Sequence, residues 1–173
     1  MAPMTAAMMT IVADSREQRP YAFAHEKYAA IVQPGTLTVG DYLLAGLIDK
    51  VAVERKELGD LVACLGRERE RFVRELQRGV ALDAFAVVVE ASWADLAQGN
   101  YKSALKPHAA CQSVLAFTAR YRTPFIFAGS RTAGEYAAWG FLKQYLGEAK
   151  KRWASIVKAH GQGQAEYGGE DHG

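Results

Sequence analysis

The chain has 173 residues, half of them apolar, and a formal net charge of +2. This length suits one domain with a substantial hydrophobic core. So small a charge neither requires nor excludes a nucleic-acid partner. No stretch approaches the ~20 apolar residues of a membrane span, and residues 1–10 lack the Lys or Arg of a secretory signal. The two cysteines form no C-x-x-C pair, so we expect a soluble, cytoplasmic protein.

The first third of the chain is predicted to be largely extended. Residues 8–13 form a short apolar strand, and a short helix is expected over residues 23–30. Residues 31–39 are extended again. Residues 41–44 and 50–56 form the two strands of a hairpin, because the loop between them carries turn residues.

Two patterns alternate in the rest of the chain. Helical spacing of apolar residues predicts helices at four places, which are residues 57–65, 67–78, 105–121 and 132–160. Gly66 separates the first two helices, and Gly147 is a candidate break in the last. Continuous apolar runs at residues 85–89 and 124–128 predict strands that are covered on both faces.

The order of these elements predicts an α/β fold in which helices flank a mixed sheet. A single domain is expected over residues 1–160. Residues 161–173 are rich in Gly, Gln and acidic residues, and we interpret them as a disordered tail. Four acidic residues stand at or near strand ends, where α/β folds build their sites; they are Asp14, Asp41, Glu54 and Glu90.

The hairpin carries the most informative chemistry. Centred on Leu47 and Ile48, it sets Asp41 opposite Glu54, at a spacing of ~4.5–5.5 Å where like charges are destabilising. A divalent cation between the two carboxylates removes that penalty, and oxygen ligands favour Mg²⁺ or Mn²⁺. Lys56 points to the same side as Glu54, because side chains alternate along a strand. Metal-dependent nucleases need this arrangement; the alternative is an ordinary hairpin with solvated charges.

Four arginines are spaced four, three and four residues apart along the helix that follows, which places them within about 60° of one face; they are Arg67, Arg71, Arg74 and Arg78. Such a row suits the phosphates of a nucleic-acid backbone. Glutamates three or four residues away allow the alternative of a salt-bridged solvent face. We favour phosphate contact for Arg67 and Arg71, which lie nearer the hairpin. Lys102, in a later loop, is a weaker candidate for DNA contact.

These motifs resemble a known family. Its signature is similar to three segments of this chain, which are Gly40-Asp41, Glu54-Arg55-Lys56-x-x-x-Asp60 and the pair Gly66-Arg67. Asp14-Ser15-Arg16-Glu17 is similar to the family's opening D-x-R-E, and Val89-Glu90 resembles its next strand. The family is the XPF-type structure-specific endonuclease domain, and the resemblance runs from about residue 9 to residue 146.

The resemblance implies a restriction-endonuclease-like fold and metal-dependent cleavage of DNA at branches, flaps or junctions between single and double strands. By the family pattern, Asp41 and Glu54 bind Mg²⁺ or Mn²⁺, and Lys56 assists the water or the transition state. The residues expected to support this site are Asp14, Arg55 and Asp60. The candidate DNA contacts are Arg16, Arg67, Arg71 and Lys102.

The remaining expectations concern the assembly of the protein and the alternatives to the nuclease function. Residues 105–121 and 132–146 carry more aromatic and small residues than a solvated helix face needs, and the family's nuclease domains pair through their later helices. We therefore expect a homodimer with Trp139 or Phe141 near the contact. Many members carry a glutamine where this chain has Arg71, and eukaryotic and archaeal members usually add a helix-hairpin-helix domain. The compact form resembles the free-standing nuclease domains of bacteria and their viruses. The rivals are a junction resolvase or restriction-like nuclease, and a DNA-binding or dimer-scaffold module that does not cut.

Overall fold

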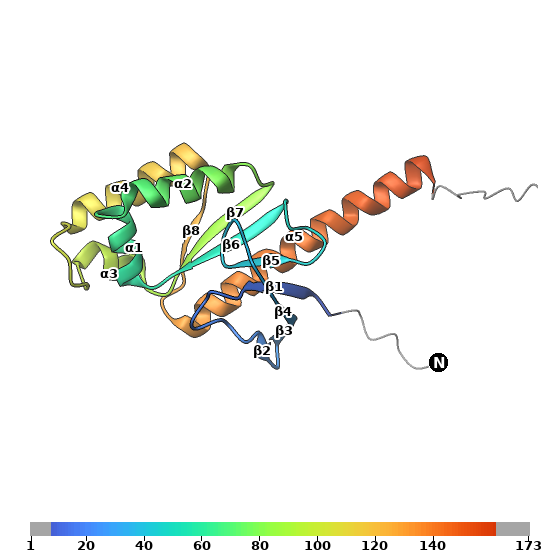
Figure 1. The fold of residues 1–173 in the computed structure, drawn as a ribbon, viewed down its shortest axis with the longest axis horizontal. Helices are drawn as coiled ribbons and strands as arrows, with labels where there is room; N and C mark the ends of the chain where they lie inside the picture. The colour runs from blue at the N-terminus through green and yellow to red at the C-terminus, as the bar shows by residue number, and fades with distance from the viewer. Residues whose placement is uncertain (1–7, 162–173) are drawn as a thin grey trace, which may run out of the picture.

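The computed structural model describes residues 8–161, and its centre is a six-stranded sheet (Figure 1). The strands lie in the order β4-β1-β5-β6-β7-β8. Their bounds are Thr10–Asp14 for β1, Ile31–Gly35 for β4, Tyr42–Leu44 for β5, Val51–Lys56 for β6, Ala84–Val89 for β7 and Phe125–Phe127 for β8. β5 runs antiparallel to β1 and β6, whereas β1 and β4 are parallel, as are β6, β7 and β8. The expected mixed sheet is confirmed.

Helices cover both faces of this sheet. Their bounds are Leu58–Leu65 for α1, Arg69–Val80 for α2, Trp93–Gln98 for α3, Pro107–Tyr121 for α4 and Arg131–His160 for α5. The first four helices pack together on one face, and α5 lies across β5, β6 and β7 on the other (Figure 1). The C-terminal half of α5 projects beyond the sheet (Figure 1).

The alternation of side chains along the strands divides the core into two layers. On β7, Phe85, Val87 and Val89 join the cluster beneath α1, α2 and α4, whereas Val88 joins the cluster beneath α5. Both faces of β7 are therefore shielded from water, which explains its continuous apolar sequence.

Residues 23–30 form a small hairpin, and the helix expected there is wrong. β2 (Ala24–His25) pairs antiparallel with β3 (Tyr28–Ala29). Phe23 adopts a positive φ of 47°, which is incompatible with a helix start. Phe23 and Tyr28 are both buried, and the Tyr28 ring packs against Trp139 of α5. Contacts with a helix more than a hundred residues away therefore override the local spacing.

Three smaller differences concern the helices. α5 continues unbroken through Gly147, since one glycine costs only ~1 kcal/mol in a helix interior. α2 begins at Arg69, so Arg67 lies in the turn before it. The short α3 was not expected from apolar spacing, but Ser92 and Asp95 form a capping box at its start.

Most of the expected tail, residues 162–173, lies outside the described residues. α5 ends at His160, and Gly161 follows it. Within residues 8–161, none of the helices combines the length and the apolar character that crossing a membrane requires.

Two glycines of α5 give opposite predictions for one substitution. At Gly134 an added Cβ would lie 2.6 Å from Tyr21 Oη, so Gly134→Ala should lower the free energy of unfolding by the ~1–3 kcal/mol typical of overpacking. At Gly147 no atom lies within 4 Å of the added Cβ. Gly147→Ala should therefore raise the free energy of unfolding by up to ~1 kcal/mol. Urea unfolding of both variants measures the difference, and equal effects would contradict the packing at Gly134.

Candidate active site

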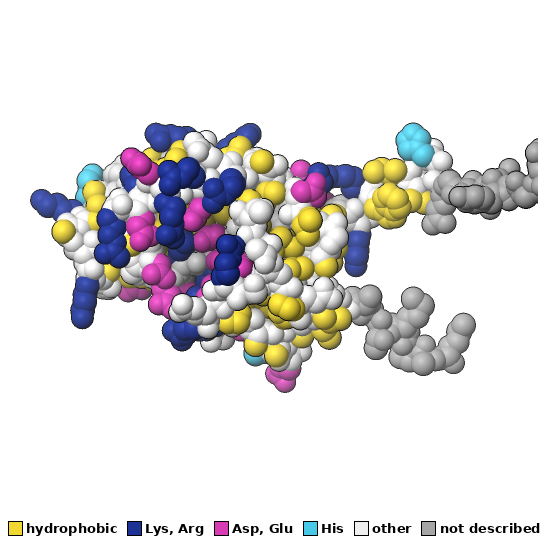
Figure 2. Space-filling view, in the orientation of Figure 1, with side chains coloured by type: hydrophobic (Ala, Val, Ile, Leu, Met, Phe, Trp, Pro, Cys, Tyr) yellow, Lys and Arg dark blue, Asp and Glu magenta, His cyan; other side chains and the backbone are white. Residues whose placement is uncertain are grey.

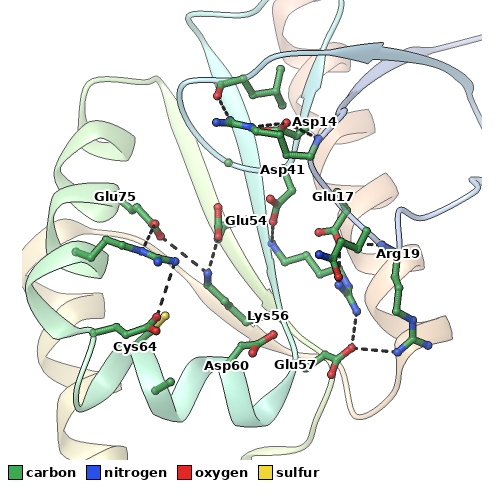
Figure 3. Close-up of a pocket in the computed structure, with 18 of the residues that line it drawn as sticks. Asp14, Glu17, Arg19, Asp41, Glu54, Lys56, Glu57, Asp60, Cys64 and Glu75 are labelled. Carbon is green, nitrogen blue, oxygen red and sulfur yellow. Dashed lines mark hydrogen bonds and ion pairs between the residues drawn. The ribbon is translucent and has the colours of Figure 1, made fainter.

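An open, charged pocket lies where β6 ends, between α1 and α2 on one side and the loops after β1 and β4 on the other. Figure 2 shows acidic side chains gathered in this hollow beside a row of Lys and Arg side chains. Figure 3 shows the same groups as sticks, converging from four separate segments of the chain.

β5 and β6 form the predicted hairpin. Tyr42 pairs with Val53, and one residue further the same register sets Asp41 opposite Glu54. The Asp41 backbone N–H donates to Val53 O at 2.8 Å. Asp41 Oδ2 accepts from the Arg55 backbone N–H at 2.7 Å. These two bonds fix the Asp41 carboxylate against the end of β6.

Gly40 allows this approach. Its φ is +69°, and a Cβ at this position would lie 2.9 Å from Val53 O. Glycine alone meets both demands without strain. The Gly-Asp pair of the motif therefore has a local structural reason, which is to bring Asp41 close to Glu54.

Burial disfavours the ionised forms of both carboxylates. Burial, followed by the charge of Glu54, raises the pKa of Asp41 to about 8. Burial also raises the pKa of Glu54, although the Lys56 ammonium opposes this. A divalent cation would offset both effects, and paired oxygen ligands suit Mg²⁺ or Mn²⁺. Within residues 8–161 no third His, Cys or acidic side chain completes a metal cluster, so water and phosphate oxygens would fill the remaining positions.

Lys56 lies beside Glu54 on the face covered by α1 and α2. Its Nζ is 2.7 Å from Glu54 Oε1 and 5.6 Å from the centre of the Phe72 ring. Burial lowers the pKa of Lys56, but the charge and hydrogen bond of Glu54 and the charges of Cys64 and Glu75 together outweigh this, and the pKa is raised. The side chain is therefore a buried cation at neutral pH, next to the carboxylate pair.

Arg55 points to the opposite face, where α5 lies. Its Nε donates to Glu90 Oε1 at 2.6 Å and its Nη2 donates to Glu90 Oε2 at 3.0 Å. Glu17 lies 3.4 Å from Arg55 Nη1. Tyr21 Oη donates to Glu90 at 2.8 Å, and Arg131 lies 3.3 Å from the same carboxylate. This buried network joins β6 and β7 to the first turn of α5.

The remaining predicted residues are spread around the pocket. Arg16 donates to both oxygens of Asp14, at 3.0 and 2.6 Å, and this pairing lowers the pKa of Asp14. The Arg16 side chain nevertheless stays 68% exposed. Asp60 lines the pocket from the first turn of α1 and is also exposed. Lys102 lies outside the pocket, exposed in the turn between α3 and α4.

Three of the four arginines in the predicted row line the pocket, namely Arg67, Arg71 and Arg78. Arg74 is exposed but does not line it. Arg71 forms ion pairs with Glu68 and Glu75, at 3.8 and 3.5 Å. The salt-bridged arrangement therefore applies to Arg71, whereas within the described residues Arg67 and Arg78 form no ion pair.

Four further acidic residues line the pocket without having been predicted as site residues, namely Glu17, Glu57, Glu68 and Glu75. Glu17 belongs to the D-x-R-E segment, so the motif was a usable signal for it. Glu75 comes from α2, where its spacing of four from Arg71 was the only signal in the sequence. Glu17 and Glu75 both lie close enough to raise the pKa of Glu54.

Comparisons with known proteins give a family match and similar solved structures. Residues 13–139 match the family model of the ERCC4 domain. One similar solved structure is XPF from Aeropyrum pernix, with a TM-score of 0.63 and 19% identity over 79% of this chain and 61% of that chain. Another is XPF from Aeropyrum pernix in complex with DNA, with a TM-score of 0.62 and 18% identity over 81% of this chain and 66% of that chain.

These likenesses differ in what they establish. The solved structures share the restriction-endonuclease-like α/β fold, and this chain spans less than two thirds of the length of each. A search of curated protein sequences gives no match. The family match, in contrast, covers well over half of the chain, and the chain therefore belongs to the ERCC4 domain family, as an XPF-type nuclease domain.

Proposed function

We propose that this protein is a divalent-metal-dependent endonuclease that hydrolyses the phosphodiester backbone of DNA at branches, flaps or junctions between single and double strands. One observation carries the proposal. Asp41 and Glu54 face each other with raised pKa values, and the Lys56 ammonium lies 2.7 Å from Glu54. The family membership and the similarity to an XPF structure in complex with DNA support the same activity.

Each side chain then has a distinct task. Asp41 and Glu54 would hold Mg²⁺ or Mn²⁺, and the cation would supply Lewis-acid chemistry that activates water and offsets charge on the scissile phosphate. Lys56 presents a fixed positive charge to the same phosphate, where a preorganised cation stabilises the transition state most effectively. Arg55 positions the strand through its bonds to Glu90 on the opposite face.

The DNA backbone is proposed to run along the exposed arginines at the pocket rim. Arg67 and Arg78 line the pocket and are exposed, and guanidinium groups bind phosphates in two-pronged geometry. Arg16 stands at the other side of the pocket, where its exposed side chain adds positive charge beside Asp14. Lys102 lies outside this path.

Removal of either facing carboxylate should abolish cleavage but leave DNA bound. Asp41→Asn and Glu54→Gln are expected to lower the cleavage rate by more than the ~10–100-fold typical of outer-shell partners, and excess chelator should act on the wild type in the same way. A labelled branched DNA with Mg²⁺, compared with intact duplex, measures the rate. Activity that persists in chelator would refute the metal; binding without cleavage by the wild type would favour the scaffold module.

The stability of the metal-free protein should fall as pH rises. The folded pKa of Asp41, about 8, lies above its ordinary value of 3.8, so the stability that protonated Asp41 contributes is lost as pH rises through the folded pKa. Asp14 and Glu90 have lowered pKa values and stay ionised in this range. Urea unfolding in chelator, between about pH 5 and about pH 8, should show a decline that Asp41→Asn flattens. If the free energy of unfolding of Asp41→Asn declines with pH as steeply as that of the wild type, groups other than Asp41 cause the decline.

The salt dependence of binding tests the arginines. Loss of one phosphate contact flattens the dependence of log affinity on log salt by ~0.9 on duplex DNA. Arg67→Ala, at the pocket rim, should show this change. Arg74→Ala is the matched control, because Arg74 is exposed but does not line the pocket. Fluorescence anisotropy over a range of salt concentrations measures both slopes. Equal slopes for the two variants would contradict the proposed path of the DNA backbone along the pocket rim.

We also propose a two-fold homodimer, the commonest closed assembly. Trp139 donates its indole N–H to Ala29 O within the chain, and Phe141 packs on the core beneath α5. The exposed large apolar side chains on the two later helices are instead Leu115 on α4, which is 50% exposed, and Tyr136, Trp153 and Ile156 on α5, which are 57%, 66% and 47% exposed.

Light scattering at micromolar concentration should therefore give twice the 18.9 kDa mass of one chain. Leu115→Glu, which places a charge on the proposed contact, should shift the mass toward the monomer. A wild-type protein that already scatters as a monomer would contradict the dimer.

A further inference from the structure

Glu75 holds a buried polar atom that the activity described so far does not explain. Its Oε2 is buried and accepts no hydrogen bond, and within residues 8–161 it is the one side-chain nitrogen or oxygen in that condition. Buried carboxylate oxygens without a partner are costly and call for a reason. The Lys56 ammonium faces this oxygen, with its Nζ 3.9 Å away, just beyond hydrogen-bond distance.

The other oxygen of Glu75 is already engaged. Arg71 Nε lies 3.5 Å from Glu75 Oε1, so the carboxylate is anchored by one oxygen with the other turned inward. Figure 3 shows this carboxylate reaching from α2 toward Lys56, on the side away from Asp41. Glu75 Oε2 is therefore an acceptor that lies beside the Lys56 ammonium without being hydrogen-bonded to it.

Lys56 has a reason to need a second acceptor. In this structure its Nζ is 2.7 Å from Glu54 Oε1, yet Glu54 is also a proposed metal ligand. A divalent cation on Glu54 repels the neighbouring ammonium and competes for the same oxygens. Lys56 is only 9% exposed, so an ammonium that loses Glu54 without a replacement would be a buried unpaired charge, which is strongly destabilising.

We propose that Glu75 is a positioning residue that takes over the Lys56 ammonium when Glu54 turns to the metal. The ammonium needs only to move from Glu54 Oε1 toward Glu75 Oε2 to do so. Glu75 then keeps Lys56 charged and oriented in the pocket and releases Glu54 for the cation. This inference rests on the proposed function, since it requires a divalent metal at Asp41 and Glu54.

Metal binding by the DNA-free protein tests the exchange without relying on cleavage. The probe is Mn²⁺, and the loss of the free-ion signal in electron paramagnetic resonance gives the affinity. Glu75→Gln should weaken Mn²⁺ binding by about tenfold, the lower end of what outer-shell partners contribute. Glu68→Gln is the matched control, because Glu68 also pairs with Arg71 but makes no contact with Lys56 within the described residues. Its effect should stay below about twofold.

A double-mutant cycle separates the exchange from a general loss of negative charge. In a Lys56→Met background no ammonium competes for Glu54, so Glu75→Gln should leave Mn²⁺ affinity unchanged. Equal weakening in both backgrounds would overturn the proposal in favour of a simple field effect. No weakening in either background would overturn it as well. Glu75→Asp keeps the charge but shortens the reach, and weakening there too would support an exchange that depends on contact.

The outcomes distinguish this inference from the function beneath it. If wild-type protein binds no Mn²⁺, or if Asp41→Asn binds it equally well, the metal site itself is wrong and the inference falls with it. If the wild type binds Mn²⁺ at Asp41 and Glu75→Gln binds it equally well, only the inference fails. Urea unfolding of Glu75→Gln checks that the variant is folded, and Glu75→Asp serves in its place if it is not.

Discussion

The structure depends on the compensation of three consecutive buried charges at the end of β6. Glu54, Arg55 and Lys56 are each no more than 9% exposed, and a buried charge without a partner would cost several kcal/mol. Because side chains alternate along the strand, Glu54 and Lys56 need partners beneath α1 and α2, whereas Arg55 needs them beneath α5. Segments from both faces of the sheet therefore pack around the end of β6 and supply the partners of these charges.

The two faces meet that need in different ways, and the difference bears on function. On the α5 face, Glu90 takes both prongs of Arg55 and also accepts from Tyr21, which is a closed and saturated network. On the other face, Glu54 repels Asp41, and one oxygen of Glu75 accepts no hydrogen bond from the described residues. Saturated contacts make a rigid support, and unsatisfied ones leave capacity for a ligand. Catalytic sites commonly combine unsatisfied polar groups in the site with well-ordered residues that support it from behind.

The sequence was sufficient where local rules decide the geometry. The facing of Asp41 and Glu54 follows from counting residues back from the hairpin turn, whereas the positive φ that makes Gly40 necessary became clear only in the structure. The sequence was insufficient where contacts between segments far apart in the chain decide the geometry. The β2–β3 hairpin depends on Trp139, and the contact between Glu75 and Lys56 depends on how α2 crosses the sheet. Helical spacing shows which residues share a face, but not what that face meets.

α2 therefore connects two groups of residues that look unrelated in the sequence, which are the arginines at the pocket rim and the side chains that contact Lys56. Its outer face and the turn before it carry arginines toward the pocket rim, while its inner face places Phe72 and Glu75 against Lys56. Arg71 connects the two, because it is exposed at the rim and also anchors Glu75. A phosphate that drew Arg71 outward would loosen the anchor of the carboxylate facing Lys56. The proposed contact with the DNA backbone and the proposed placement of the Lys56 charge would thus both depend on one helix, and a change on either face of α2 is expected to affect the other.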